Sequence, residues 1–321
     1  MEKSPDWVLR VFGIGDDAPL VQLWNRTLVR DPISVEIFRR QTLLDPNFQA
    51  EGCLLAETAG GGHELLGFVL ATAPHVTRLF ARRQGIGRIV GLGVVPEARG
   101  RGIGTALLDA AITYLRQRGC QRIDVAAHEY FAAGVDKQAY PDGIRFLRTR
   151  GFEEMRESVA MGRSLYDFSW SEAARAAEAR LLQEGVEVRY FESADTYALV
   201  EYFRREFPPN VEFFLRKLDA RHSYDEMIVA LYRGEVLGYC QHLDSDHIGP
   251  FGVAAAHRNR GIGTVMLYRL LERMREKGYK FAWFGETGRA RAYYERAGFT
   301  VMRCYAVLSR TLEQTGVGKE G

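Results

Sequence analysis

The sequence has few cysteines, no long apolar run and almost no excess of charge. Its four cysteines form no CxxC pair and no Cys/His ligand spacing, so we expect reduced core thiols and no metal site. No run approaches the ~18 apolar residues of a membrane span, and the first residues lack the apolar stretch of a secretory leader. These absences predict a cytoplasmic globular protein without a membrane partner.

The charge balance excludes a second group of functions. The 43 Lys and Arg residues nearly match the 41 Asp and Glu residues, which leaves a formal net charge of +2. A field that weak does not favour binding to nucleic acid or to an anionic membrane surface. The chain is 46% hydrophobic over 321 residues, enough for two cores at roughly 150 residues each. The composition predicts two globular domains rather than a disordered chain.

The chain contains one pattern twice. The segment RGRGIGT at 99–105 returns as RNRGIGT at 258–264, an offset of 159 residues. Gly119 and Gly278 share this offset. The offset is 179 residues from Asp16 to Asp195 and 147 residues from Gly151-Phe152 to Gly298-Phe299. The order of the anchors is kept, as expected for two copies of one domain with unequal loops. We predict repeats at 1–166 and 186–321, joined by a helical connector at 167–185.

Both repeats show the same order of expected elements. A strand and an amphipathic helix come first, followed by two β-rich runs and a further strand that ends at the Arg/Gly loop. The loop opens a helix that glycine 119 or 278 ends, and another strand, a short helix and a last strand follow. In the connector, Ser169 and Glu172 are expected to form a capping box. The predicted fold class is therefore mixed α/β, with more strands than helices.

The Arg/Gly loop has the chemistry of an anion site. Free N–H groups at the start of a helix favour a bound phosphate, and glycines let the main chain approach it without a Cβ. The GK[ST] of a Walker loop is absent. A dinucleotide loop of an oxidoreductase is disfavoured, because GxGxxG belongs near the start of a βαβ unit with an acid about 20 residues later. The pattern that remains is Arg-x-x-Gly-x-Gly after a strand.

This loop and the motif that follows it resemble the GNAT superfamily of acetyl-CoA-dependent N-acetyltransferases. The later motif of that superfamily, Ala-x-x-x-Tyr-x-x-x-Gly-Phe, is present as Ala290, Tyr294, Gly298 and Phe299. The resemblance occurs once in each repeat, and the two together cover nearly the whole chain. The tandem arrangement is similar to that of the mycothiol synthases and related double-domain members. It implies two GNAT-like domains, each a twisted, mostly antiparallel sheet flanked by helices, with acetyl-CoA as co-substrate.

The resemblance also implies which residues bind the coenzyme. They are the residues of the two loops and one strand residue ahead of each, whose main-chain N–H would hold the thioester oxyanion. In the second repeat they are Val253, Arg258, Asn259, Arg260, Gly261, Ile262, Gly263 and Thr264. In the first repeat they are Val94, Arg99, Gly100, Arg101, Gly102 and Gly104.

Acyl transfer to an amine needs an acceptor for the amine proton and a proton donor for the departing thiolate. By the resemblance the donor is Tyr294, whereas the first repeat has Leu147 there, which has no proton to give. The resemblance also implies a base eleven residues before the first arginine of the loop, where this chain has His247. Glu286 after the next strand and water stay open as alternatives. Arg88 stands at the His247 position of the first repeat, so we expect the chemistry in the second repeat.

Two functions remain open from the sequence. The first is transfer of an acetyl group to a primary amine of a small molecule or peptide, by direct attack in a ternary complex. The alternative is a non-catalytic acyl-CoA-binding sensor or scaffold. No segment encodes a recognisable acceptor, and we expect a monomer or homodimer with no nucleic-acid partner.

Overall fold

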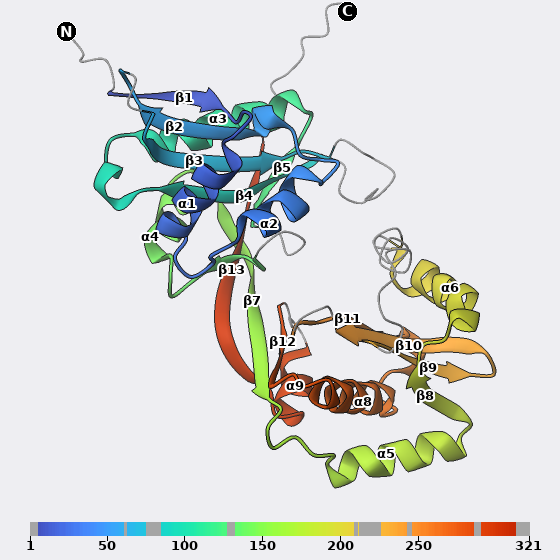
Figure 1. Cartoon of the computed structure of the whole chain (residues 1–321). Helices are drawn as coiled ribbons and strands as arrows, with labels where there is room; N and C mark the ends of the chain where they lie inside the picture. Colours follow the sequence, from blue (N-terminus) through green and yellow to red (C-terminus); the bar gives the residue numbers. More distant parts are fainter. Residues whose placement is uncertain are drawn as a thin grey trace, which may run out of the picture. The chain divides into compact units, whose positions relative to one another are not determined.

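The chain forms two compact units in a computed structural model that describes residues 6–60, 63–74, 85–126, 132–208, 211, 226–242, 246–285 and 290–312. The first unit comprises Met1–Ser158 together with Cys304–Gly321, and the second comprises Val159–Arg303. Figure 1 shows the strands and helices of both units.

The first unit contains a mostly antiparallel sheet in the order β1-β2-β3-β4-β5-β13, to which the short β6 adds by pairing with β13. One neighbouring pair, β4 and β5, is parallel. The strands are β1 (Trp7–Val11), β2 (Cys53–Thr58), β3 (Leu65–Thr72), β4 (Ile86–Val94), β5 (Arg122–Val125), β6 (Val135–Asp136) and β13 (Thr300–Thr311).

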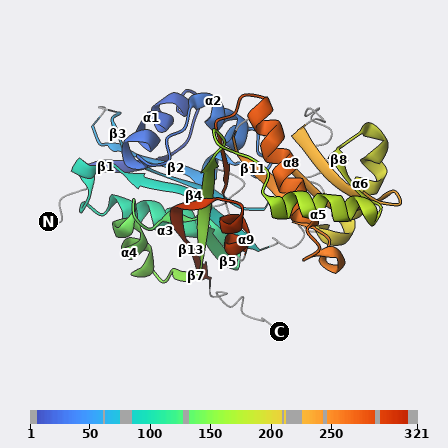
Figure 2. The ribbon, with the colours of Figure 1, turned by 90° about the horizontal axis from the view of Figure 1, so that it is seen from below.

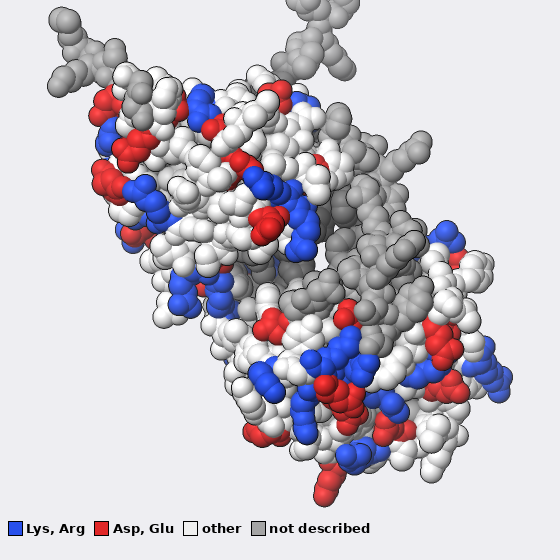
Figure 3. All heavy atoms as spheres, in the orientation of Figure 1, with Lys and Arg blue, Asp and Glu red and all other residues white. Residues whose placement is uncertain are grey.

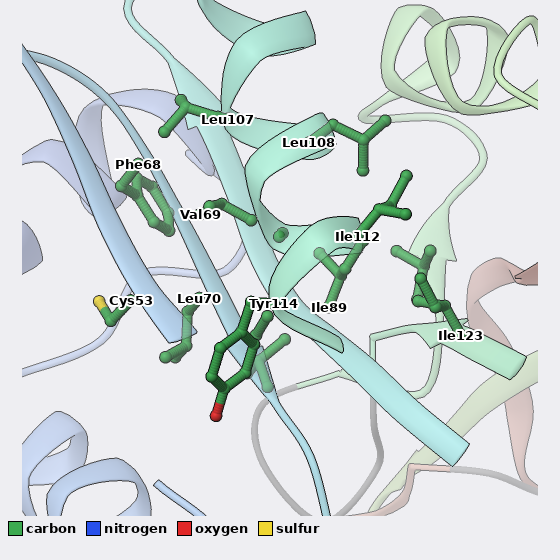
Figure 4. Packing of buried hydrophobic residues seen from close by; sticks show 14 of the residues in the cluster. Cys53, Phe68, Val69, Leu70, Ile89, Leu107, Leu108, Ile112, Tyr114 and Ile123 are labelled. Atoms are coloured by element: carbon green, nitrogen blue, oxygen red, sulfur yellow. The ribbon is translucent and has the colours of Figure 1, made fainter. Parts of the chain in front are cut away.

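Helices cover both faces of this sheet, because successive residues of a strand face opposite sides. Phe68 of β3 stacks on Trp24 with 5.2 Å between ring centroids. Its neighbour Gly67 lies against the other helix layer, where an added Cβ would come within 3.0 Å of Leu107 Cδ1. Figure 4 shows the core built from this second layer and the strands. The helices are α1 (Asp17–Thr27), α2 (Val35–Phe38), α3 (Ile103–Gln117) and α4 (Pro141–Arg148).

The second unit repeats this layering. Tyr239 packs edge-on against Phe203 of α6 at 5.1 Å between ring centroids, while a Cβ on Gly238 would come within 2.8 Å of Met266 Sδ of α8. Helix α5 lies alongside α8 (Figures 1 and 2). The four-stranded sheet has the order β11-β10-β9-β8. The elements are α5 (Glu172–Gln183), β8 (Val186–Tyr190), α6 (Thr196–Glu206), β9 (Met227–Tyr232), β10 (Glu235–His242), β11 (Ile248–Val253), α8 (Ile262–Glu276), β12 (Phe281–Phe284) and α9 (Arg291–Arg296).

The last strand of each repeat completes the other unit. In the first unit, residues 308–311 of β13 pair with β5, with Leu308 opposite Val125. In the second unit, residues 161–164 of β7 (Glu153–Ser164) pair with β12, with Met161 opposite Phe284. Both strands have 12 residues, about twice the usual length, so each is long enough to reach both units. The repeat limits at 166 and 186 describe the two copies in the sequence and stay a prediction. In the compact units, the end of each copy's last strand belongs to the unit formed by the other copy.

The connector is a helix, as expected, but its first turn differs from the prediction. Ser171 caps α5, because its Oγ accepts a hydrogen bond from Ala174 N at 3.2 Å. The predicted capping box at Ser169 and Glu172 is wrong, since Glu172 is already the first helical residue. No helix in the described residues is long and apolar enough to cross a membrane. On the face drawn in Figure 3, basic and acidic side chains are interspersed.

An Arg–Asp pair closes the turn after the first strand of each repeat. Arg10 Nη1 and Nη2 lie 2.6 and 2.8 Å from the two carboxylate oxygens of Asp16. Arg189 holds Asp195 in the same way at 2.7 and 2.9 Å, and Glu192 N also donates to that carboxylate. The pair therefore anchors the start of the following helix in both copies.

This pair predicts a loss of stability in acid. The hydrogen bond from Arg189 lowers the pKa of Asp195 below its unfolded value of about 3.9. Its stabilisation is therefore present above about pH 4 and is lost as the pH falls through the lower folded pKa. We expect Asp195→Asn to cost about 1–3 kcal/mol at neutral pH, and to weaken the pH dependence of urea unfolding between neutral and strongly acid pH. An unchanged pH dependence would contradict this role.

Candidate functional site

The Arg/Gly loop has the same backbone path in both units. Arg99 Nε donates to Val94 O at 3.2 Å, and Arg258 Nε donates to Val253 O at 3.1 Å. The first arginine of each loop therefore ties the loop back to the strand before it.

The glycines of the loop occupy left-handed positions. Gly102 and Gly261 precede their helices with φ of 81° and 87°, and Gly100 has φ of 77°. In the second unit, Asn259 stands at the position of Gly100 and has φ of 62°, a conformation that asparagine tolerates better than most residues. The loop can thus differ in sequence and keep its shape.

The first turn of the helix after each loop offers main-chain donors. In α8 the hydrogen bond that closes the first turn joins Val265 N to Gly261 O at 3.0 Å, so the N–H groups of 262–264 precede the helical ladder. In α3 the corresponding bond joins Ala106 N to Gly102 O, also at 3.0 Å. Together with the helix dipole, these donors suit a diphosphate.

The strand N–H predicted to hold the oxyanion points away from the antiparallel sheet. Ala254 N donates to Leu237 O of β10 at 2.8 Å. Because neighbouring residues of a strand direct their N–H groups to opposite sides, Val253 directs its N–H away from β10. Val95 N donates to Leu66 O at 2.9 Å, so Val94 has the same orientation in the first unit.

That side of the strand faces a gap between two parallel strands. In the first unit, β4 and β5 pair as far as Ile89 and Val125, and β4 then continues to Val94 past the end of β5, still paired with β3. In the second unit, an isolated parallel bridge joins His247 to Trp283 just before β11, and no ladder between β11 and β12 follows it within the described residues. Each unit therefore places a strand N–H and a helix start beyond the point where the parallel pairing ends.

Tyr294 lies in the gap of the second unit. Its ring centroid is 4.1 Å from Phe284 of β12 and 6.2 Å from Phe251 of β11, and the residue is 6% exposed. Burial raises the pKa of its hydroxyl well above 10, so the phenol keeps its proton at neutral pH. Its role as proton donor stays a prediction, and its position beside both strands is consistent with that role.

The two base residues are placed differently. The half-buried His247 lies where the gap closes, and its ring packs on Trp283 with 4.3 Å between ring centroids. The indole N–H of Trp283 donates to Asp246 Oδ1 at 2.9 Å. Glu286 lies outside the described residues. Within the described ranges, no group of three or more His, Cys, Asp or Glu side chains could hold a metal ion.

The first unit fills the corresponding place with other residues. Leu147 stands at the Tyr294 position and is buried in the apolar core. Phe146 lies 3.6 Å from where a Cβ of Gly104 would be. Arg150 stacks over Phe146 at 3.8 Å and donates from Nη2 to Thr105 Oγ1 at 2.6 Å. The loop is thus retained without a proton donor at the predicted position.

The packing of α5 against the second loop was not predicted. Arg180 Nη2 donates to Arg260 O at 2.9 Å, and Glu184 pairs with Arg260 at 2.6 Å. A Cβ on Gly261 would come within 3.0 Å of both Ala177 Cβ and Arg180 Nη2. The apolar spacing of the connector indicates that one of its faces is buried, but it contains no signal for what covers that face.

A family model and curated relatives identify what the chain is similar to. The acetyltransferase (GNAT) family model matches residues 20–152 and again 173–299. The mycothiol acetyltransferase of Thermobispora bispora is 36% identical over 104 residues, 31% of this chain and 32% of that protein. The one from Mycobacterium leprae is 32% identical over 120 residues, 35% of this chain and 36% of that protein. The matched segments thus span about a third of these relatives.

Solved structures share the fold at low sequence identity. The GCN5-related N-acetyltransferase from Sphaerobacter thermophilus aligns over 96% of both chains with a TM-score of 0.71 and 18% identity. A tandem GNAT protein from the clavulanic acid biosynthesis pathway aligns over 97% of this chain and 100% of its own, with a TM-score of 0.64 and 15% identity. Because the family model matches both repeats, the chain belongs to the acetyltransferase (GNAT) family, as a tandem member that resembles the mycothiol synthases.

Proposed function

We propose that this chain transfers an acetyl group from acetyl-CoA to a primary amine, with the chemistry in the second unit. One observation carries the proposal. The neutral, buried phenol of Tyr294 is in ring contact with Phe251 of β11 and Phe284 of β12. The bridge between the strands lies just before β11 begins, and the Val253 N–H and the start of α8 lie at the other end of β11. The first unit has Leu147 in place of the phenol.

The residues of the chain fit a coenzyme with a diphosphate and an extended arm. The N–H groups of 262–264 offer donors to the diphosphate, and Gly263 leaves open the space that a Cβ would fill beside Val253 and Phe251. The arm would then run along the side of β11 that has no ladder with β12 in the described residues.

Direct attack assigns one task to each group. The amine nitrogen attacks the thioester carbonyl carbon, and the Val253 N–H stabilises the negative charge on the carbonyl oxygen. As the C–N bond is completed and the C–S bond breaks, Tyr294 gives its proton to the departing sulfur. The proton of the amine passes to His247, to Glu286 or to water, and the phenol is reprotonated from solvent.

The acceptor belongs to the same proposal. A primary amine on a small molecule or peptide is the class that the reaction requires. The matched relatives are named mycothiol acetyltransferase, so a panel of amines should include mycothiol-type compounds. The first unit keeps its loop, and we assign it to coenzyme binding or to structure rather than to chemistry.

A pair of matched glycine variants tests the assignment of the chemistry to the second unit. Alanine is well tolerated in the first turn of a helix, yet the methyl group of Gly263→Ala would lie 3.5 Å from Val253 Cγ2, beside the diphosphate donors. We expect kcat/KM for acetyl-CoA to fall about 10²-fold in a thiol-release assay, since a displacement near 1 Å costs about that much. Gly104→Ala, the same change in the first unit, should leave most of the turnover.

The same assay separates the proposal from its alternative. Equal losses in the two variants would refute the division between the units. Binding of CoA by the native chain, with no thiol release from acetyl-CoA for any amine in the panel, would favour the non-catalytic acyl-CoA binder.

A further inference from the structure

The hydroxyl of Tyr293 lies at the start of α8 in the second unit. A Cβ on Gly263 would be 3.4 Å from Tyr293 Oη, and Val253 Cγ2 and Phe251 Cζ would be 3.5 and 3.6 Å from the same point. The phenol therefore faces the same side of the first helical turn as the end of β11. The hydroxyl is thus placed beside the first helical turn, whose N–H groups of 262–264 have no partner in the helical ladder.

The two adjacent tyrosines of α9 have different surroundings. Tyr294 packs against Phe284 and Phe299, with ring centroids at 4.1 and 5.9 Å. Tyr293 packs on Phe251 at 6.1 Å and reaches Gly263 with its hydroxyl. One phenol is thus held between the separating strands, and the other is held against the loop.

The Tyr293 hydroxyl is a donor without an acceptor. Its oxygen is buried and has no hydrogen-bond partner within the described residues. Burial raises the pKa of this phenol well above 10, so it carries its proton at neutral pH. The Thr264 hydroxyl, as a weak donor to the phenol oxygen, offsets part of that rise, but a donor supplies no acceptor for the phenol's own proton. A buried donor is costly to leave unpaired, which points to a partner that binds there.

The first unit shows that packing alone does not require this hydroxyl. Phe146 takes the matching place, 3.6 Å from the Cβ position of Gly104. Val94 Cγ2 lies 3.6 Å from that point, much as Val253 does in the second unit. The same ring contacts are therefore made by phenylalanine, and the oxygen is an addition confined to the second unit.

We infer that the Tyr293 hydroxyl donates a hydrogen bond to the diphosphate of the coenzyme bound at the start of α8. The inference rests on the proposed function. The helix start attracts an anionic acceptor to the side of the turn that the hydroxyl faces, and a hydrogen bond to a charged oxygen is stronger than one between neutral groups. Tyr293 is therefore a binding residue for the diphosphate, whereas Tyr294 acts at the thioester.

Tyr293→Phe tests this role by removing one oxygen and keeping the ring. Calorimetry on the full chain should show CoA binding about 10- to 100-fold weaker. The Tm without ligand should stay the same or rise, because a buried donor without a partner has been removed. Tyr197→Phe is the control, since it removes a hydroxyl from a side chain that is 74% exposed on α6, and it should leave both values unchanged.

A coenzyme without the diphosphate gives the decisive comparison. S-acetylpantetheine carries the same thioester and arm, so the native chain and Tyr293→Phe should use it with equal kcat/KM. With acetyl-CoA, the kcat/KM of Tyr293→Phe should be lower than that of the native chain. Equal losses with both thioesters, or undiminished CoA affinity in Tyr293→Phe, would overturn the inference and leave the proposed function standing. Absence of any CoA binding by the native chain would overturn both.

Discussion

Replacing Leu308 by alanine is expected to destabilise the first unit by about 2–5 kcal/mol, the usual cost of emptying a buried leucine site. Leu308 lies in the second repeat, yet it is fully buried in the core of the first unit and pairs with Val125. Its counterpart in the first repeat, by the offset between the two Gly-Phe pairs, is Met161. That residue is fully buried and pairs with Phe284 of the second unit, so Met161→Ala should destabilise the second unit to a similar extent.

Hydrogen exchange read by mass spectrometry distinguishes the two units. Protection of β4 and β5 should fall in Leu308→Ala, and protection of β12 should fall in Met161→Ala. Leu182→Ala on α5 is the control, because that side chain is 69% exposed and its removal should change stability by no more than about 0.5 kcal/mol. If Leu308→Ala lowered protection in the second unit and Met161→Ala lowered it in the first, the assignment of each last strand to the other unit would be wrong.

Replacing Tyr294 by phenylalanine is expected to lower kcat about 10²- to 10⁴-fold, the range typical of a lost general acid. The ring contacts with Phe251 and Phe284 should survive, because phenylalanine has the same ring. CoA affinity should therefore change little, in contrast to the weaker CoA binding and retained use of S-acetylpantetheine expected for Tyr293→Phe.

Steady-state kinetics and calorimetry on the same preparations measure both quantities. Because burial raises the pKa of the Tyr294 hydroxyl, the native chain should also show no loss of this proton up to about pH 10. A kcat for Tyr294→Phe equal to that of the native chain would show that the residue only packs the gap.

Local features of the fold follow from the sequence. The loop glycines predict left-handed turns and helix starts because φ near +80° is accessible to glycine without strain, and Gly102 and Gly261 adopt it. Gly119 and Gly278, predicted to end the long helices, have φ of 75° and 91° just after them. Comparison of the two copies likewise predicts which unit lacks a phenol, because Leu147 and Tyr294 stand at matching positions.

Two parts of the site depended on contacts between residues that are distant in the sequence. The apolar pattern of the connector predicts a helix with one buried face, but Arg180 and Ala177 of α5 meet the loop at Gly261 through packing that no local pattern encodes. Tyr293 precedes the motif tyrosine and has no signal of its own. Its aligned partner Phe146 is the one hint in the sequence that the position differs between the copies.

The sequence by itself determined the two repeats, the order of their strands and helices, and the loops that open α3 and α8, because backbone conformation and hydrophobic period are properties of neighbouring residues. Only the tertiary structure decided that β7 and β13 exchange units, that α5 covers the second loop, and that adjacent phenols face a strand gap and a helix start. The physical reason is that a strand edge or a buried face specifies the kind of surface it needs, while the choice of partner is made by the packing of the whole chain.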